Sequence, residues 1–118
     1  MSRHRNPWLK LLRKVQLCGS RNASRSRIKA VTITEDDLHK QWNKQDGKCY
    51  WLNIPMNIDD VYTTNNPFAP SVDRLHNDKD YHADNIVICT MFANLGRGRL
   101  DEQSFTLFVK YLKDHIND

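Results

Sequence analysis

Two short strand candidates, 72–75 and 86–89, constrain the fold of this chain more than any other feature. A polar stretch, 76–84, separates them, and a brief helical pattern follows over 90–95 and ends at Gly96. Two short strands on either side of a polar loop are typical of an antiparallel hairpin. The order of these segments therefore predicts a ββα unit, and the expected fold class is α+β.

Apolar spacing predicts helices on both sides of this unit. A cap and a first-turn proline, Asn6-Pro7, open a basic helix that we expect to end at Gly19. The capping-box sequence 34–37 opens a second helix, which should end near Gly47. A last helix carries an apolar stripe that we expect to pack against the core. The stripe consists of Phe105, Phe108, Val109, Leu112 and Ile116.

The segments between these elements carry weaker patterns. Residues 49–52 are expected to form a short strand, and their Asn and Pro content predicts a loop over 57–70. Cys49 and Cys89 fall on expected strands, so we assign both to the core. The chain has three cysteines and no CxxC pair, which argues against a disulfide framework and against a cysteine-ligated zinc module.

Positive charge is concentrated at the start of the chain. Nine of the 18 Lys and Arg residues lie within 1–29, whereas all 14 Asp and Glu residues lie from Glu35 onward. Such a basic segment, residues 1–29, suits binding to a polyanionic partner. The alternative interpretation is that these residues form a solvated tail without a binding role. We therefore expect a basic DNA-binding arm or helix over 1–30, followed by one domain over 31–118.

A membrane location is not expected. No apolar run approaches the length that a membrane-spanning helix needs, and no signal-peptide core follows the first arginines. The expectation is a cytoplasmic protein without a membrane partner.

Two oxygen-bearing side chains stand at the ends of the ββα unit. Asp73 closes the first expected strand, and Asn94 lies on the helix after the second. Such a unit can bring both side chains to one point while leaving other coordination positions open. Mg²⁺ prefers oxygen ligands and keeps several positions for water or substrate phosphates. The pattern therefore predicts one Mg²⁺ or Mn²⁺ ion at Asp73 and Asn94, and no zinc.

The same region carries a joint motif. It consists of Pro70-Ser71-Val72-Asp73-Arg74-Leu75, then Tyr81, Asp84-Asn85 and Asn94. In this motif the chain resembles HNH (ββα-metal) endonucleases, in particular members from phages and mobile elements. The likeness runs from about Ile33 to the C-terminal helix. It implies a metal-dependent DNA endonuclease that hydrolyses phosphodiester bonds and cuts or nicks double-stranded DNA.

The resemblance also implies a role for each residue of the motif. Asp73 and Asn94 match the metal ligands, and Asn85 matches the central Asn that holds the loop through hydrogen bonds to the backbone. Arg74 stands where most members have the His that activates water. Because the pKa of an Arg lies above ~12, it cannot accept a proton near neutral pH. Arg74 is therefore expected to bind the scissile phosphate, and another group must serve as the base.

Several groups are candidates for that base. Tyr81 is the first choice, because members with Arg at this position have a Tyr there, and a metal with Arg74 would lower the phenol pKa from its usual ~10. His76 and His82 are alternatives, since a histidine needs no large pKa shift. Metal-bound hydroxide without a protein base is a further alternative. Asp80 departs from the family pattern, which has Gly before the Tyr.

The cations expected to contact DNA lie in two places. One set is the basic arm, whose phosphate contacts would supply affinity that is independent of base sequence. The other set is Arg97 and Arg99, on either side of Gly98. The expected contacts of the arm are Arg3, Arg5, Arg13, Lys14, Arg21, Arg25, Arg27 and Lys29.

Two other functions stay open. The first is a non-catalytic nucleic-acid-binding protein on a degenerate HNH scaffold, because the usual His is replaced by Arg74. The second is a basic RNA-binding or structural protein in which the Asp and Asn residues only form turns. A homodimer is an assembly that the sequence leaves open.

Overall fold

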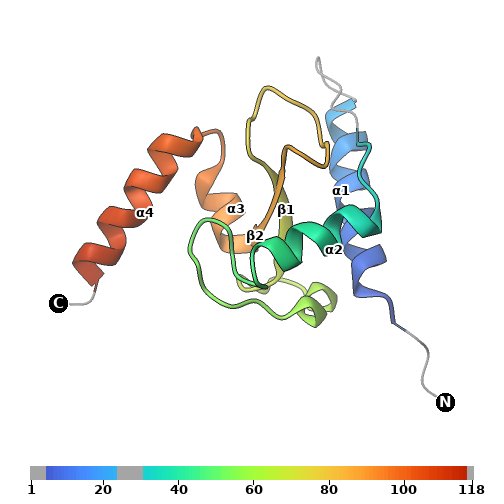
Figure 1. The fold of residues 1–118 in the computed structure, drawn as a ribbon, viewed down its shortest axis with the longest axis horizontal. Coiled ribbons are helices and arrows are strands. Elements are labelled where there is room, and N and C mark those ends of the chain that lie inside the picture. The colour runs from blue at the N-terminus through green and yellow to red at the C-terminus, as the bar shows by residue number, and fades with distance from the viewer. Residues whose placement is uncertain (1–4, 24–30, 117–118) are drawn as a thin grey trace.

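The computed structural model describes residues 5–23 and 31–116, with side chains up to Leu17 in the first of these ranges. A two-stranded antiparallel hairpin lies between two groups of helices (Figure 1). The elements are α1 (Pro7–Ala23), α2 (Glu35–Lys44), the 3-10 helix η1 (Ile58–Tyr62), β1 (Pro70–Arg74), β2 (Ile86–Thr90), α3 (Met91–Arg97) and α4 (Glu102–Ile116). The predicted α+β class is confirmed.

The register of the hairpin gives each of its faces a different chemistry. Val72 is paired with Ile88, and Asp73 with Val87. Because side chains alternate along a strand, Val72 and Asp73 point to opposite faces. The predicted hairpin is confirmed, and each strand end lies within two residues of its expected position.

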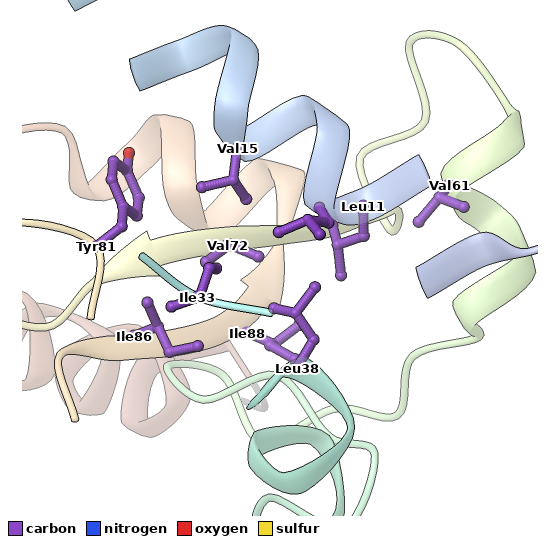
Figure 2. Packing of buried hydrophobic residues seen from close by; sticks show 10 residues of the cluster. Leu11, Val15, Ile33, Leu38, Val61, Val72, Tyr81, Ile86 and Ile88 are labelled. Carbon is purple, nitrogen blue, oxygen red and sulfur yellow. The ribbon is translucent and has the colours of Figure 1, made fainter. Parts of the chain in front are cut away.

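The first core cluster lies on the Val72 face, where α1, α2 and η1 pack (Figure 2). The helix α1 contributes Leu11, Leu12 and Val15, all of them buried. The helical part of the expected arm therefore packs in the same core cluster as the hairpin. The reason is the apolar face of α1, which is buried against the hairpin.

The second core cluster lies on the other face of the hairpin. It joins Cys49 and Cys89 to the start of α4, so the prediction that both cysteines are in the core is confirmed. The stripe predicted along α4 is correct only in part. Phe105 and Val109 are buried, whereas Phe108 and Ile116 are 52% and 70% exposed. The second half of α4 extends away from the hairpin, which is why its apolar side chains do not pack in the core (Figure 1).

Three local predictions are corrected by the structure. The helix α1 continues past Gly19, because a glycine inside a helix costs only about 1 kcal/mol and does not by itself end it. Residues 49–52 form a turn rather than a strand, since Cys49 N–H donates to the Ile54 carbonyl at 2.8 Å and closes the chain on itself. The expected loop over 57–70 contains η1, which Asn57 caps.

The predicted capping box is confirmed. The Thr34 hydroxyl accepts from Asp37 N–H at 3.2 Å, and the Asp37 carboxylate accepts from Thr34 N–H at 2.9 Å. Within the described ranges, none of the helices has the length and apolar character that crossing a membrane requires.

Candidate functional site

The helix α3 lies along the face of β1 that carries Asp73. Thr90 caps α3, its hydroxyl accepting from Ala93 N–H at 3.2 Å. On the next turn Asn94 Nδ2 donates to Ser71 Oγ at 2.6 Å, and one turn further Arg97 Nη1 donates to Asp73 Oδ2 at 2.8 Å. Asp73 and Asn94, the predicted metal ligands, therefore lie on the same face of the hairpin, in successive contacts between α3 and β1.

The Asp73 carboxylate is held by three N–H donors. Trp51 Nε1 donates to Oδ2 at 3.2 Å beside the bond from Arg97, and Arg74 N–H donates to Oδ1 at 2.8 Å. The Asp73 side chain keeps 11% of its surface exposed. The bond from the Trp51 ring nitrogen is a contact that the sequence did not indicate.

Arg97 is a buried residue, not a phosphate contact. Its side chain is fully enclosed, and besides Asp73 it donates to the carbonyls of Arg74 at 2.6 Å and Leu75 at 2.9 Å. Its guanidinium stands 4.7 Å over the centre of the Trp51 ring. The predicted contact of Arg97 with DNA is therefore wrong for this structure, because the side chain ties α3 to the end of β1.

Arg99, two residues later, is exposed, and its contact with DNA stays a prediction. The signal that could have identified Arg97 is its spacing. It lies three residues after Asn94, on the same side of α3, just as Asp73 lies two residues after Ser71 on one face of β1.

The side-chain oxygens of Asp73 and Asn94 are of the kind that binds a divalent cation such as Mg²⁺. Asp73 Oδ1 accepts one hydrogen bond, and Asn94 uses Nδ2 for Ser71, so one oxygen of each side chain is suited to coordinate a metal. In the part of the chain that the structure describes, no three His, Cys, Asp or Glu residues gather. An ion at Asp73 and Asn94 would take its other ligands from water and phosphate, as Mg²⁺ and Mn²⁺ do. Arg97 would compete with it for the Asp73 carboxylate.

Asn85 holds the loop between the strands. Its Oδ1 accepts from His76 N–H at 2.9 Å, and its Nδ2 donates to the carbonyls of His76 at 3.1 Å and Asp80 at 2.9 Å. The loop-holding role that was expected of Asn85 is confirmed. Arg74 adds to it through Nη1, which donates to the carbonyls of Asn77 at 2.8 Å and Lys79 at 3.2 Å.

Tyr81 lies on the hairpin face opposite Asp73. It is 8% exposed and belongs to the first core cluster (Figure 2). Its ring centre is 5.3 Å from the Arg74 guanidinium, and its carbonyl accepts from Thr32 N–H. This location does not fit a base that must reach water beside Asp73.

The two histidines proposed as alternatives are both exposed. His82 Nδ1 lies 2.7 Å from the Thr32 hydroxyl, close to the start of the second described range. His76 lies three residues beyond Asp73, and Asn85 fixes its backbone on both sides.

Burial keeps the thiol nearest to this site protonated. Cys89 lies on the Asp73 face of the hairpin, and its burial, with the Asp73 charge as a smaller cause, raises the pKa of its thiol well above the usual value. A thiol with a raised pKa is a poor nucleophile and a poor metal ligand at neutral pH.

The cations of the basic segment, residues 1–29, are described only in part. Arg5, Lys10, Arg13 and Lys14 lie on or next to α1, outside the buried face of that helix. The other predicted DNA contacts of this segment lie outside the described side chains. These are Arg3, Arg21, Arg25, Arg27 and Lys29.

The likeness to HNH endonucleases depends on the motif residues and on their geometry beside α3. The hairpin, its loop and α3 follow one another in the expected order. No protein-family model matches the chain, and a search of curated proteins finds no similar protein.

Proposed function

We propose that this protein is a metal-dependent DNA endonuclease of the HNH type, which hydrolyses phosphodiester bonds in double-stranded DNA. The observation that carries the proposal is the packing of α3 on β1, which brings Asp73 and Asn94 to one face of the hairpin. Asn85, which holds the loop above them, supports the same function. The cations of α1 support a polyanionic substrate.

Each residue would have a distinct part in hydrolysis. Asp73 and Asn94 would hold Mg²⁺ or Mn²⁺, which when bound stabilises charge on the leaving oxygen. Arg74 holds the loop through the carbonyls of Asn77 and Lys79 and lies over the Tyr81 ring, on the face opposite Asp73, so we do not assign the scissile phosphate to it. Asn85 would fix the loop so that the base meets the attacking water in one geometry.

Among the candidate bases, we propose His76. It is exposed, it lies two residues after the end of β1, and Asn85 holds both its N–H and its carbonyl. Tyr81 lies in the core on the other face of the hairpin, and His82 lies beside Thr32.

The first test is the metal requirement itself. Supercoiled plasmid should be nicked or linearised by the whole protein in Mg²⁺ or Mn²⁺, and EDTA should stop the reaction, because the ion supplies charge stabilisation that no side chain replaces. The measurement is agarose electrophoresis of the plasmid forms over time. Cleavage at full rate in EDTA would contradict the proposal.

The base is tested by three substitutions compared in single-turnover cleavage. His76→Ala should lower the rate of the chemical step by about 10²–10⁴-fold, the range typical of the loss of a general base. Tyr81→Phe, which keeps the buried ring, and His82→Ala should cleave at close to the wild-type rate. A large loss in Tyr81→Phe with an active His76→Ala variant would return the role to Tyr81.

One observation favours a second function, a DNA-binding protein without catalysis. The ion pair between Asp73 and Arg97 is buried, and a cation must share the carboxylate with a guanidinium 2.8 Å away. This alternative predicts DNA binding that is insensitive to metal, with plasmid left intact in Mg²⁺ and in Mn²⁺.

A further inference from the structure

A groove lined with cations lies between α1 and the end of η1. We call it the α1 groove and define it by Arg5, Lys10, Arg13, Lys14 and Tyr62. These residues line a hollow of about 610 Å³, and none of the described residues in its lining is acidic. Lys10, Lys14 and Tyr62 also line a second hollow of about 550 Å³ beside it. The two hollows therefore lie next to each other and share these three residues.

The cations gather on the side of α1 that does not enter the core. Lys10, Arg13 and Lys14 are spaced by three and four residues, which places them on one face of a helix. Like charges at this spacing repel one another and destabilise an isolated helix. None of these three forms an ion pair with a carboxylate of the described residues. The Glu35 carboxylate accepts from Asn6, which also lines the groove, at 2.8 Å. The charge of the groove is thus not neutralised from within.

Contacts inside the groove hold the cations in place. The Arg5 guanidinium stands 4.6 Å from the centre of the Tyr62 ring, and Lys10 Nζ stands 5.9 Å from it. Lys14 Nζ donates to the Val61 carbonyl at 3.0 Å. Burial, together with the neighbouring charge of Lys10, lowers the pKa of Lys14. An anion bound in the groove would relieve this repulsion.

We propose that the α1 groove binds the phosphate backbone of double-stranded DNA at a distance from the cut. The site rests on the proposed function, and it adds an anchoring site that the catalytic residues do not include. At about 1.5 Å of rise per helical residue, Lys10 and Lys14 lie roughly 6 Å apart along α1, which matches about two phosphates of one strand. The second hollow continues past the polar loop 63–66 to Phe92 and Leu95 of α3, the helix that carries Asn94. Backbone held in the groove would therefore lead toward the candidate site.

Duplex binding in EDTA tests the groove without any need for cleavage. The double variant Lys10→Gln/Arg13→Gln removes two exposed charges and keeps long side chains with good helix propensity. The matched control is Lys40→Gln/Lys110→Gln, which removes two exposed lysines paired with carboxylates on α2 and α4. The measurement is fluorescence anisotropy of a labelled duplex at increasing salt, with a thermal melt of each variant.

The slope of log affinity against log salt should fall by about 0.9 for each phosphate that the protein no longer neutralises, which amounts to about 1.8 in the groove variant. The control variant should keep the wild-type slope. A groove variant with the wild-type slope would overturn the proposal. If the slope falls in the groove variant but the wild-type protein does not cut DNA, the groove stands and the catalytic function fails. If the wild-type protein cuts plasmid in Mg²⁺ but the groove variant keeps the wild-type slope, the catalytic function stands and the proposal for the groove fails.

Discussion

Replacing Asn94 with Ala is expected to lower metal-dependent cleavage of DNA by about 10²-fold or more. The amide oxygen is one of only two protein oxygens that we assign to the metal, and a bound ion contributes several kcal/mol to the stabilisation of transition-state charge. The cost in stability should be about 1 kcal/mol, since the amide makes one strong hydrogen bond, to Ser71. Cleavage is measured on plasmid, and unfolding is measured in urea.

Ser71→Ala provides the matched control for Asn94. It removes the same hydrogen bond from the other partner and leaves the amide oxygen in the chain. We expect a similar small loss of stability and a rate within a few-fold of wild type. An Asn94→Ala variant that cleaves as fast as Ser71→Ala would remove Asn94 from the metal site.

Replacing Arg97 with Met is expected to lower the free energy of unfolding by about 3–5 kcal/mol. The Arg97 guanidinium is enclosed and donates to the Asp73 carboxylate, which is only 11% exposed. Its loss therefore leaves a nearly buried carboxylate without its positive partner. It also removes hydrogen bonds to two backbone carbonyls at the end of β1. Urea denaturation followed by circular dichroism measures the change.

Arg99→Met is the control, because Arg99 is an exposed arginine two residues further on. An exposed substitution of this kind should change stability by no more than about 0.5 kcal/mol. If Arg97→Met and Arg99→Met unfold at the same urea concentration, the buried ion pair does not stabilise the fold. In the Arg97→Met variant Mn²⁺ should raise the melting temperature more than in the wild-type protein, since the ion no longer competes with the guanidinium.

The sequence by itself determined the ββα unit and the starts of the two helices before it. The segments 72–75 and 86–89 predict the hairpin, because short strands on either side of a polar loop pair with each other. The capping box at Thr34 and the cap of α1 at Asn6 were also readable, since each depends on residues only three positions apart. Asn85 belongs with these, because its three bonds lie within its own loop.

Only the tertiary structure decided which side chains meet across the hairpin. The partner of Asp73 depends on how α3 is rotated and shifted along β1, and that position is set by packing in a cluster that joins segments from Cys49 to Val109. For the same reason the Arg97 side chain is buried against Asp73 instead of lying in solvent. Trp51 donates to the same Asp73 carboxylate from residues 49–52, which form a turn although a strand was expected there. The side of the hairpin on which Tyr81 lies was likewise decided by long-range contacts, since its segment is bridged to Val31, fifty residues earlier in the chain. Local patterns carry no information about such contacts, because their energy comes from residues that are adjacent only after folding.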